Sequence, residues 1–267
     1  MPQHPLIFFQ GRNQTLPYTG RGIPIPPRQA NIGDRPAHIQ RIINSFDTAW
    51  AEQARLLEQR SALSLPTRNG IYLEVSSEPG GELAYGSLES LKSNTRLLNV
   101  RTATAQNGDP ITYATIFIPF TSRATIATKL LKYAETVDKE SPKNKKLVES
   151  INEIRTAIAE SFWTDDRNHM PSDEKKWCEI WLQGCDPDVS DVQLRAVAAT
   201  LNIECMPGML NFPERTIKLC KVNRSDLQSL LDSCPHIAEF RLSRESAQFF
   251  TELENFDQQE WTEALLR

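Results

Sequence analysis

The spacing of hydrophobic residues changes several times within residues 174–242. Side chains first alternate, with Cys178, Ile180 and Leu182 on one side, which predicts a strand that is buried on one face. A helical spacing follows, then two alternating runs, a second helical spacing and a last alternating run. The order strand, helix, strand, strand, helix, strand is the split β-α-β layout of a ferredoxin-like unit.

A fainter series of the same kind runs from Gly70 to Val137, but it lacks a final strand. Ahead of it, an amphipathic pattern from Ala37 to about Gln59 predicts a helix. The apolar face of that helix would carry Ile39, Ile42, Ile43, Phe46, Trp50 and Leu57. The predicted fold class is therefore α+β, with two tandem ferredoxin-like (split β-α-β) units and connecting helices.

A third apolar stripe, from Leu147 to Phe162, has residues spaced four, three, four and four apart and predicts a helix that bridges the two units. The polar stretch from Asp165 to Asp173 is the predicted boundary between them. The chain then divides into an extended arm at 1–36, a first unit with its helices at 37–165, a second unit at 174–242, and terminal helices at 243–267.

The composition, 39% hydrophobic and 24% charged, is typical of a soluble globular protein. A formal net charge of −4 without a long basic run argues against nucleic-acid binding. No apolar stretch approaches the roughly 20 residues of a membrane span. The short apolar run within Met1–Gln10 has no leading basic residue and no cleavage site, so it predicts a strand rather than a signal peptide. We expect a cytoplasmic protein with neither nucleic acid nor membrane as partner.

The cysteines are odd in number, and no two of them have C-x-x-C spacing. They are Cys178, Cys185, Cys205, Cys220 and Cys234. This pattern favours reduced thiols buried in the core, with a disulfide or a metal site as the alternatives. The four histidines are scattered, so we predict no metal and no cofactor.

Sequence motifs of catalysis are absent: the chain has no G-x-S-x-G, no P-loop and no H-E-x-x-H. The nearest approach to paired carboxylates is Asp165 with Asp166, beside Phe162 and Trp163. A helix end in solvent explains these two acids better than an active site does. We therefore predict no catalytic residue, and whether the chain belongs to an enzyme is left open.

Two tryptophans alternate with the predicted core residues of the first strand in the second unit. If Cys178 and its neighbours face the core, Trp177 and Trp181 point to the opposite face, and Glu239 and Arg241 of the last strand lie beside them. Trp and Arg dominate the energetics of protein interfaces, so these four residues are the candidate protein-binding site. The alternative is that the bridging helix or the terminal helix covers the tryptophans.

Five runs of sequence follow one another along nearly the whole chain in a recognisable order. They are Asn69–Pro79, Pro142–Arg155, Ser161–Asp165, Phe212–Thr216 and Glu260–Leu266. Together they resemble the N-terminal region of long bacterial subtilisin-like serine peptidases. In that family the peptidase domain, with its Asp, His and Ser, begins shortly after the final helix. The resemblance therefore carries no catalytic residue onto this chain.

The resemblance implies a non-catalytic regulatory region that acts as a folding aid or inhibitor of a peptidase domain. Subtilisin prosegments are ferredoxin-like units that pack one sheet face on the protease. Some family members are encoded beside an AAA-type ATPase and are associated with plasmid maintenance and phage defence. The alternative is thus a protein-binding module that docks such an ATPase or senses a trigger. One departure is that about two dozen residues, mostly helical by pattern, follow Leu242, whereas a prosegment continues as an extended tail.

Overall fold

The long first helix, α1 (Arg35–Ala62), confirms the amphipathic pattern from which it was predicted. The structure is a computed structural model and describes residues 32–183 and 186–243. The side chain of Asp34 accepts a hydrogen bond from the amide of Ala37 at 2.9 Å and caps the helix. The helix buries a row of apolar side chains: Ile39, Ile42, Phe46, Trp50 and Leu57. This face packs against the first of two sheets.

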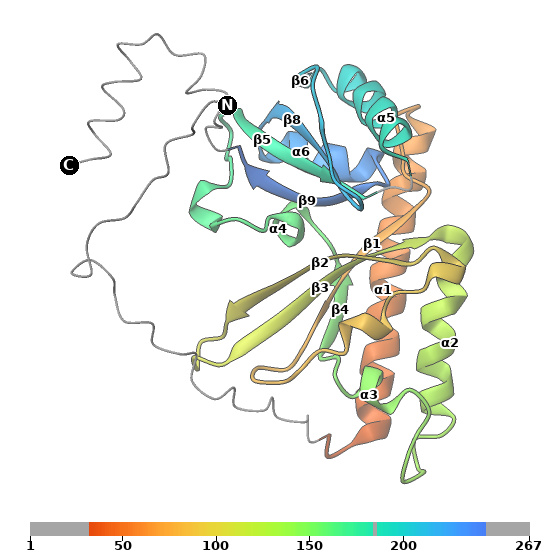
Figure 1. Cartoon of the computed structure of the whole chain (residues 1–267). Helices are drawn as coiled ribbons and strands as arrows, with labels where there is room; N and C mark the ends of the chain where they lie inside the picture. The colour runs from red at the N-terminus through yellow and green to blue at the C-terminus, as the bar shows by residue number, and fades with distance from the viewer. Residues whose placement is uncertain (1–31, 184–185, 244–267) are drawn as a thin grey trace, which may run out of the picture.

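The first sheet is antiparallel throughout and has the strand order β2-β3-β1-β4. Its strands are β1 (Gly70–Ser76), β2 (Arg96–Thr104), β3 (Pro110–Pro119) and β4 (Glu153–Thr156). Helices α1 and α2 (Arg123–Ala134) lie on one side of it (Figure 1). The short helix expected between β1 and β2 is replaced by two 3-10 turns, η2 (Tyr85–Ser87) and η3 (Leu91–Ser93); a third turn, η4 (Phe120–Ser122), leads into α2.

The predicted bridging helix over Leu147–Phe162 is wrong. The segment forms two single helical turns, α3 (Lys145–Val148) and α4 (Ala159–Phe162), with β4 between them. Ile154 lies opposite Val75 in the pairing of β4 with β1, so the free edge of β1 provides backbone partners that an isolated segment does not have. Strand β4 is also the final strand that the sequence pattern of the first unit lacked.

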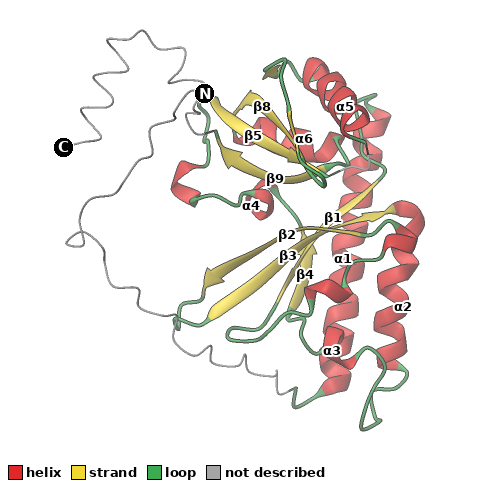
Figure 2. Ribbon diagram, viewed as in Figure 1, coloured by secondary structure: helices red, strands yellow, loops and turns green. Residues whose placement is uncertain are grey.

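The second sheet is also antiparallel, with the order β6-β8-β5-β9 and with β7 paired to β8. Its strands are β5 (Lys176–Leu182), β6 (Glu204–Cys205), β7 (Leu210–Asn211), β8 (Thr216–Val222) and β9 (Ile237–Leu242). Helices α5 (Pro187–Thr200) and α6 (Arg224–Ser233) pack on one face (Figure 2). The predicted core positions of β5 are confirmed, because Cys178, Ile180 and Leu182 are buried against these helices. The α+β class is likewise confirmed.

The two sheets share a continuous core rather than being joined by a free linker. Tyr72 and Phe117, on the side of the first sheet away from α1, pack with Phe162, and Phe162 contacts Phe240 of β9. The Tyr72 hydroxyl donates to the carbonyl of Cys234 at 2.7 Å. The predicted boundary segment contains the turn η5 (Arg167–His169) and begins next to β9.

Several predictions fall outside the described residues. The strand at Met1–Gln10 and most of the extended arm at 1–36 lie there, except that α1 already begins at Arg35. The terminal helices predicted for 243–267 also lie there, apart from Ser243. Within ranges 32–183 and 186–243, no helix is long and apolar enough to cross a membrane.

The prediction of five reduced cysteines is wrong for two of them. Cys205 and Cys220 form a disulfide between β6 and β8. They are 15 residues apart in sequence, a spacing that matches no motif, and only the pairing of the two strands places them opposite each other. Cys178 and Cys234 are buried free thiols, and Cys185 lies outside the described residues.

Candidate protein-binding face of the second sheet

The candidate site is the face of the second sheet that α5 and α6 leave uncovered. Because side chains alternate along a strand, Trp177 and Trp181 of β5 lie on this face, opposite to the buried Ile180. Both tryptophans are partly exposed. Trp181 has Ile217 of β8 as one cross-strand neighbour and Glu239 of β9 as the other.

Trp181 is held by three polar or aromatic neighbours. Its indole stacks on the ring of Phe212, with 6.3 Å between ring centroids and 5° between ring planes. The guanidinium of Arg241 lies 4.2 Å from the centroid of the Trp181 ring, within the range of a cation–π contact. The indole Nε1 donates to Glu179 Oε2 at 2.9 Å. These contacts orient an indole that remains partly accessible to solvent.

Glu239 is buried and binds Arg241, so its carboxylate is not exposed to solvent as the guanidinium is. Its residue is only 8% exposed, and Glu239 Oε2 accepts from Arg241 Nη2 at 3.0 Å and from the Thr164 hydroxyl at 2.8 Å. Arg241 Nε in turn donates to Thr164 Oγ1 at 3.2 Å. Arg241 is therefore available at the surface, whereas Glu239 fixes its position.

A hollow of about 380 Å³ opens beside this network. Its walls come from β5, β9 and the segment after α4, and they consist of Thr164, Asp165, Glu179, Trp181, Arg241 and Leu242. The hollow thus combines an indole, a guanidinium and two carboxylates. The hollow therefore offers an aromatic ring and groups of both charges to a ligand or a partner.

The structure brings together three of the four predicted site residues. Trp181, Glu239 and Arg241 form the network. Trp177 lies two residues before Glu179 on the same face of β5, opposite Lys221 of β8. The carbonyl of Trp177 accepts from the amide of Ser243 at 3.0 Å. The sequence left open that the bridging helix or the terminal helix covers the two tryptophans. The bridging helix does not form, and the terminal segment lies outside the described residues.

Sequence reasoning missed two apolar members of this face, Leu210 and Phe212. Leu210 pairs with Ile217 and so shares its face, and the two missed residues are 63% and 52% exposed. Strand β7 has only two residues, which is too short for a detectable alternation. No periodic signal in the sequence marks either residue.

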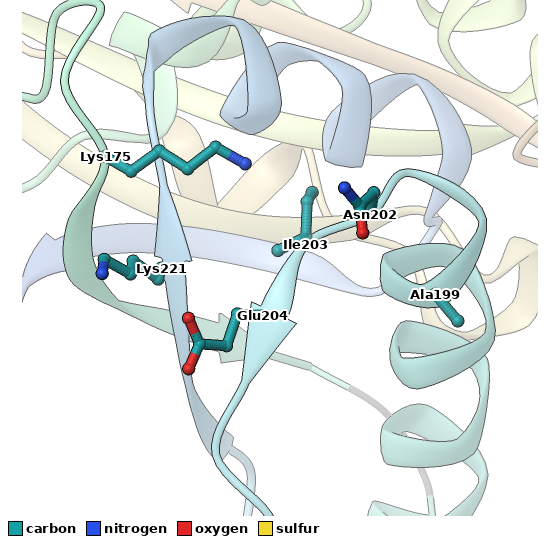
Figure 3. Close-up of a pocket in the computed structure, with 6 residues that line it drawn as sticks. All are labelled: Lys175, Ala199, Asn202, Ile203, Glu204 and Lys221. Carbon is teal, nitrogen blue, oxygen red and sulfur yellow. The ribbon is translucent and has the colours of Figure 1, made fainter.

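A second hollow, of about 400 Å³, lies at the β6 edge of the same sheet (Figure 3). Its lining is mostly polar: Lys175, Ala199, Asn202, Ile203, Glu204 and Lys221. Lys175 is already paired with Asp226 at 3.2 Å. A third, of about 250 Å³, lies between α4 and the start of α6. Neither has the exposed aromatic residues of the Trp181 face.

Metal binding has no candidate within the part of the chain that the structure describes, because no three His, Cys, Asp or Glu side chains gather there. No protein-family model matches the chain. The comparison with curated proteins likewise finds no relative.

Proposed function

We propose that this chain is the non-catalytic regulatory region of a subtilisin-like serine peptidase and binds the peptidase domain as a folding aid or inhibitor. The observation that carries the proposal is the open sheet face on which Trp181 stacks with the exposed Phe212. Contiguous exposed apolar groups on a soluble domain mark interaction sites. The partner comes from the resemblance of the five sequence runs described above.

The strand orders support the finer fold assignment. In each sheet the second, third, first and fourth strands of the unit lie side by side in that order, if the two-residue β7 is set aside. This is the order of a ferredoxin-like unit, and we infer two such units. In the first unit, 3-10 turns stand where a ferredoxin-like unit has its first helix, and α1 supplies the missing cover.

The face has the composition of an interface hot spot. Trp, Arg and aromatic neighbours concentrate binding energy when a partner desolvates them. Here the indole and the guanidinium are pre-oriented by Phe212, Glu179 and Glu239. A partner would therefore lose little free energy in ordering these side chains on binding.

Binding to a separately produced peptidase domain tests the proposal. We expect Trp181→Ala and Phe212→Ala each to weaken binding by about 2 kcal/mol, which is roughly 30-fold in Kd. Leu91→Ala is the control, since Leu91 is an exposed apolar residue of the first unit and its loss should leave Kd unchanged. Circular dichroism verifies that the variants fold. Unchanged Kd in both face variants would contradict the proposal.

The second candidate is a docking module for an AAA-type ATPase that uses the same face. The mixed charges of the hollow beside Trp181 favour it, because Asp165, Glu179 and Arg241 offer both signs of charge to a partner. Peptidase assays distinguish the two: a regulatory region changes the peptidase rate when added in trans, whereas a docking module binds the ATPase and leaves that rate unchanged.

A further inference from the structure

Three cysteines lie side by side across three neighbouring strands of the second sheet. Cys220 of β8 is the direct register partner of Cys205 on β6 and of Cys178 on β5. Cys205 and Cys220 form the disulfide, and Cys178 remains a thiol. Because direct cross-strand partners share a face, all three belong to the side of the sheet that α5 and α6 cover.

Solvent reaches only one of the three. Cys205 is partly exposed, whereas Cys220 and Cys178 are 0% exposed. Cys205 is therefore the side from which a thiolate in solution would reach the bridge, with the sulfur of Cys220 as leaving group. Burial raises the pKa of the Cys178 thiol to about 12, so Cys178 stays protonated near neutral pH and competes poorly in exchange.

Besides the disulfide, residues 204–215 are held by two short strand pairings and by single hydrogen bonds. Two of these bonds come from arginines: Arg195 Nη2 donates to the Pro207 carbonyl at 3.3 Å, and Arg215 Nη2 donates to the Leu98 carbonyl at 2.7 Å. Strands β6 and β7 have two residues each, and the side chains between them are mostly exposed. The amide of Met206 donates to Leu219 at 2.8 Å, and Lys218 Nζ donates to the carbonyl of Pro207 at 3.0 Å. The same segment continues to Phe212, which stacks on Trp181.

We propose that the Cys205–Cys220 disulfide is a reversible redox clasp that holds residues 204–215 in place, and with them one wall of the Trp181 face. A dithiol reductant opens it: one thiolate forms a mixed disulfide with Cys205 and expels the Cys220 thiolate, which takes up a proton. The second thiol of the reductant, as a thiolate, then attacks the reductant sulfur that is bonded to Cys205. Cys205 leaves as a thiolate and takes up a proton. Two electrons pass to the protein, and the reductant leaves as a disulfide. We expect the fold of the second unit to remain, because β5 keeps its pairing with β8 and β9 and its packing under α5 and α6.

Hydrogen exchange of the full chain, before and after mild dithiothreitol treatment, tests the clasp. Alkylation and peptide mapping should find Cys205 and Cys220 bonded before reduction, and both labelled afterwards, with Cys178 and Cys234 still protected. We expect amides in 204–215 to exchange at least about tenfold faster in the reduced form, while β5 and α6 keep their protection. Chymotrypsin should likewise cleave faster after Leu210, an exposed residue of the same segment.

Matched variants isolate the cause. Cys205→Ser should reproduce the reduced pattern without reductant, and Cys178→Ala should keep the redox response. If either variant fails to fold, the comparison of the two forms of the natural chain decides alone. Equal exchange of 204–215 in both forms, loss of protection throughout the second unit on reduction, or free thiols at Cys205 and Cys220 after air oxidation would each overturn the proposal.

The consequence for binding rests on the proposed function and has its own readout. A loosened segment removes the stacking partner of Trp181, so the reduced form should bind the peptidase domain several-fold more weakly. Faster exchange in 204–215 with unchanged binding would support the clasp and contradict the use of this face. Loss of binding in Trp181→Ala with redox-independent exchange would contradict the clasp alone.

Discussion

Trp181 and Phe212 lie parallel, 5° apart in ring plane, although one belongs to β5 and the other follows the two-residue β7. Between the strands that carry them runs β8, whose Ile217 is the neighbour of Trp181 on one side and of Leu210 on the other. The pair is therefore a product of strand pairing. Among the described residues, the stack leaves Phe212 half exposed.

A double-mutant cycle should detect the stack in the free protein. Phe212→Ala alone should lower the free energy of unfolding by about 1 kcal/mol, and it should cost less when Trp181 is already Ala, since aromatic pairs contribute roughly 0.5–1.5 kcal/mol beyond their buried area. Urea unfolding gives the free energy of unfolding of the natural chain, the two single variants and the double variant. Phe120, which contacts Trp50 instead, is the control, and its substitution should show no coupling to Trp181.

Glu74 should make stability depend on acid pH. Its side chain is fully buried and is ion-paired to Arg101 and Arg155. Burial by itself would raise its pKa, but the two guanidinium groups outweigh burial and hold the pKa below its ordinary value of 4.5. Glu74 therefore binds a proton more readily in the unfolded chain than in the folded protein. The stabilisation that ionised Glu74 gives to the folded state is complete above pH 4.5 and is lost as pH falls through the lower pKa of the folded state.

The variant Glu74→Gln should be less stable than the natural chain by about 3 kcal/mol at pH 7, because it leaves a buried guanidinium uncompensated. The gap should narrow as pH falls below 4.5, which urea unfolding at several pH values measures. Asp47→Asn removes an exposed pair with Arg123 and should change stability by less than about 0.5 kcal/mol at either pH. A gap that is the same at pH 3 and pH 7 would rule out this role for Glu74.

Removing the hydroxyl of Tyr72 should weaken the junction between the two units. Tyr72→Phe leaves the Cys234 carbonyl without this donor, and we expect a cost of about 1–2 kcal/mol in the free energy of unfolding. Guanidinium unfolding followed by far-UV circular dichroism gives the value. Tyr85→Phe, at an exposed position in η2, should be neutral; a similar loss in both variants would mean that the Tyr72 hydrogen bond has no special weight.

Gly70 should not tolerate a side chain. A Cβ built there would lie 2.5 Å from the Ile118 carbonyl oxygen and 2.8 Å from the Cα of Pro119, and backbone atoms of a paired strand cannot move away cheaply. Gly70→Ala should lower the melting temperature by an amount corresponding to about 2 kcal/mol or more. Gly86→Ala meets no heavy atom within 4 Å and should melt with the natural protein. Equal melting of the two variants would show that β1 can shift away from β3.

Patterns that one element satisfies by itself could be predicted from sequence. The apolar stripe of α1 and the alternation of Cys178, Ile180 and Leu182 both state which face is buried, since 3.6-residue and 2-residue periods follow from local backbone geometry. The orientation of Trp181 away from the core follows from the same alternation. These local patterns were enough for the α+β class and for three residues of the network around Trp181.

Other features depend on which partner is present, and only the tertiary structure decided them. Ile154 has helical spacing to the apolar residues before and after it. Its segment nevertheless forms strand β4, because the edge of β1 offers it backbone hydrogen-bond partners. Cys205 meets Cys220, and Phe212 meets Trp181, through the pairing of β6 and β7 with β8. These strands are too short to leave a period in the sequence. By itself the sequence determined the faces of its longer elements; the edges, the disulfide and the completed aromatic face came from long-range backbone hydrogen bonds, which local patterns do not record.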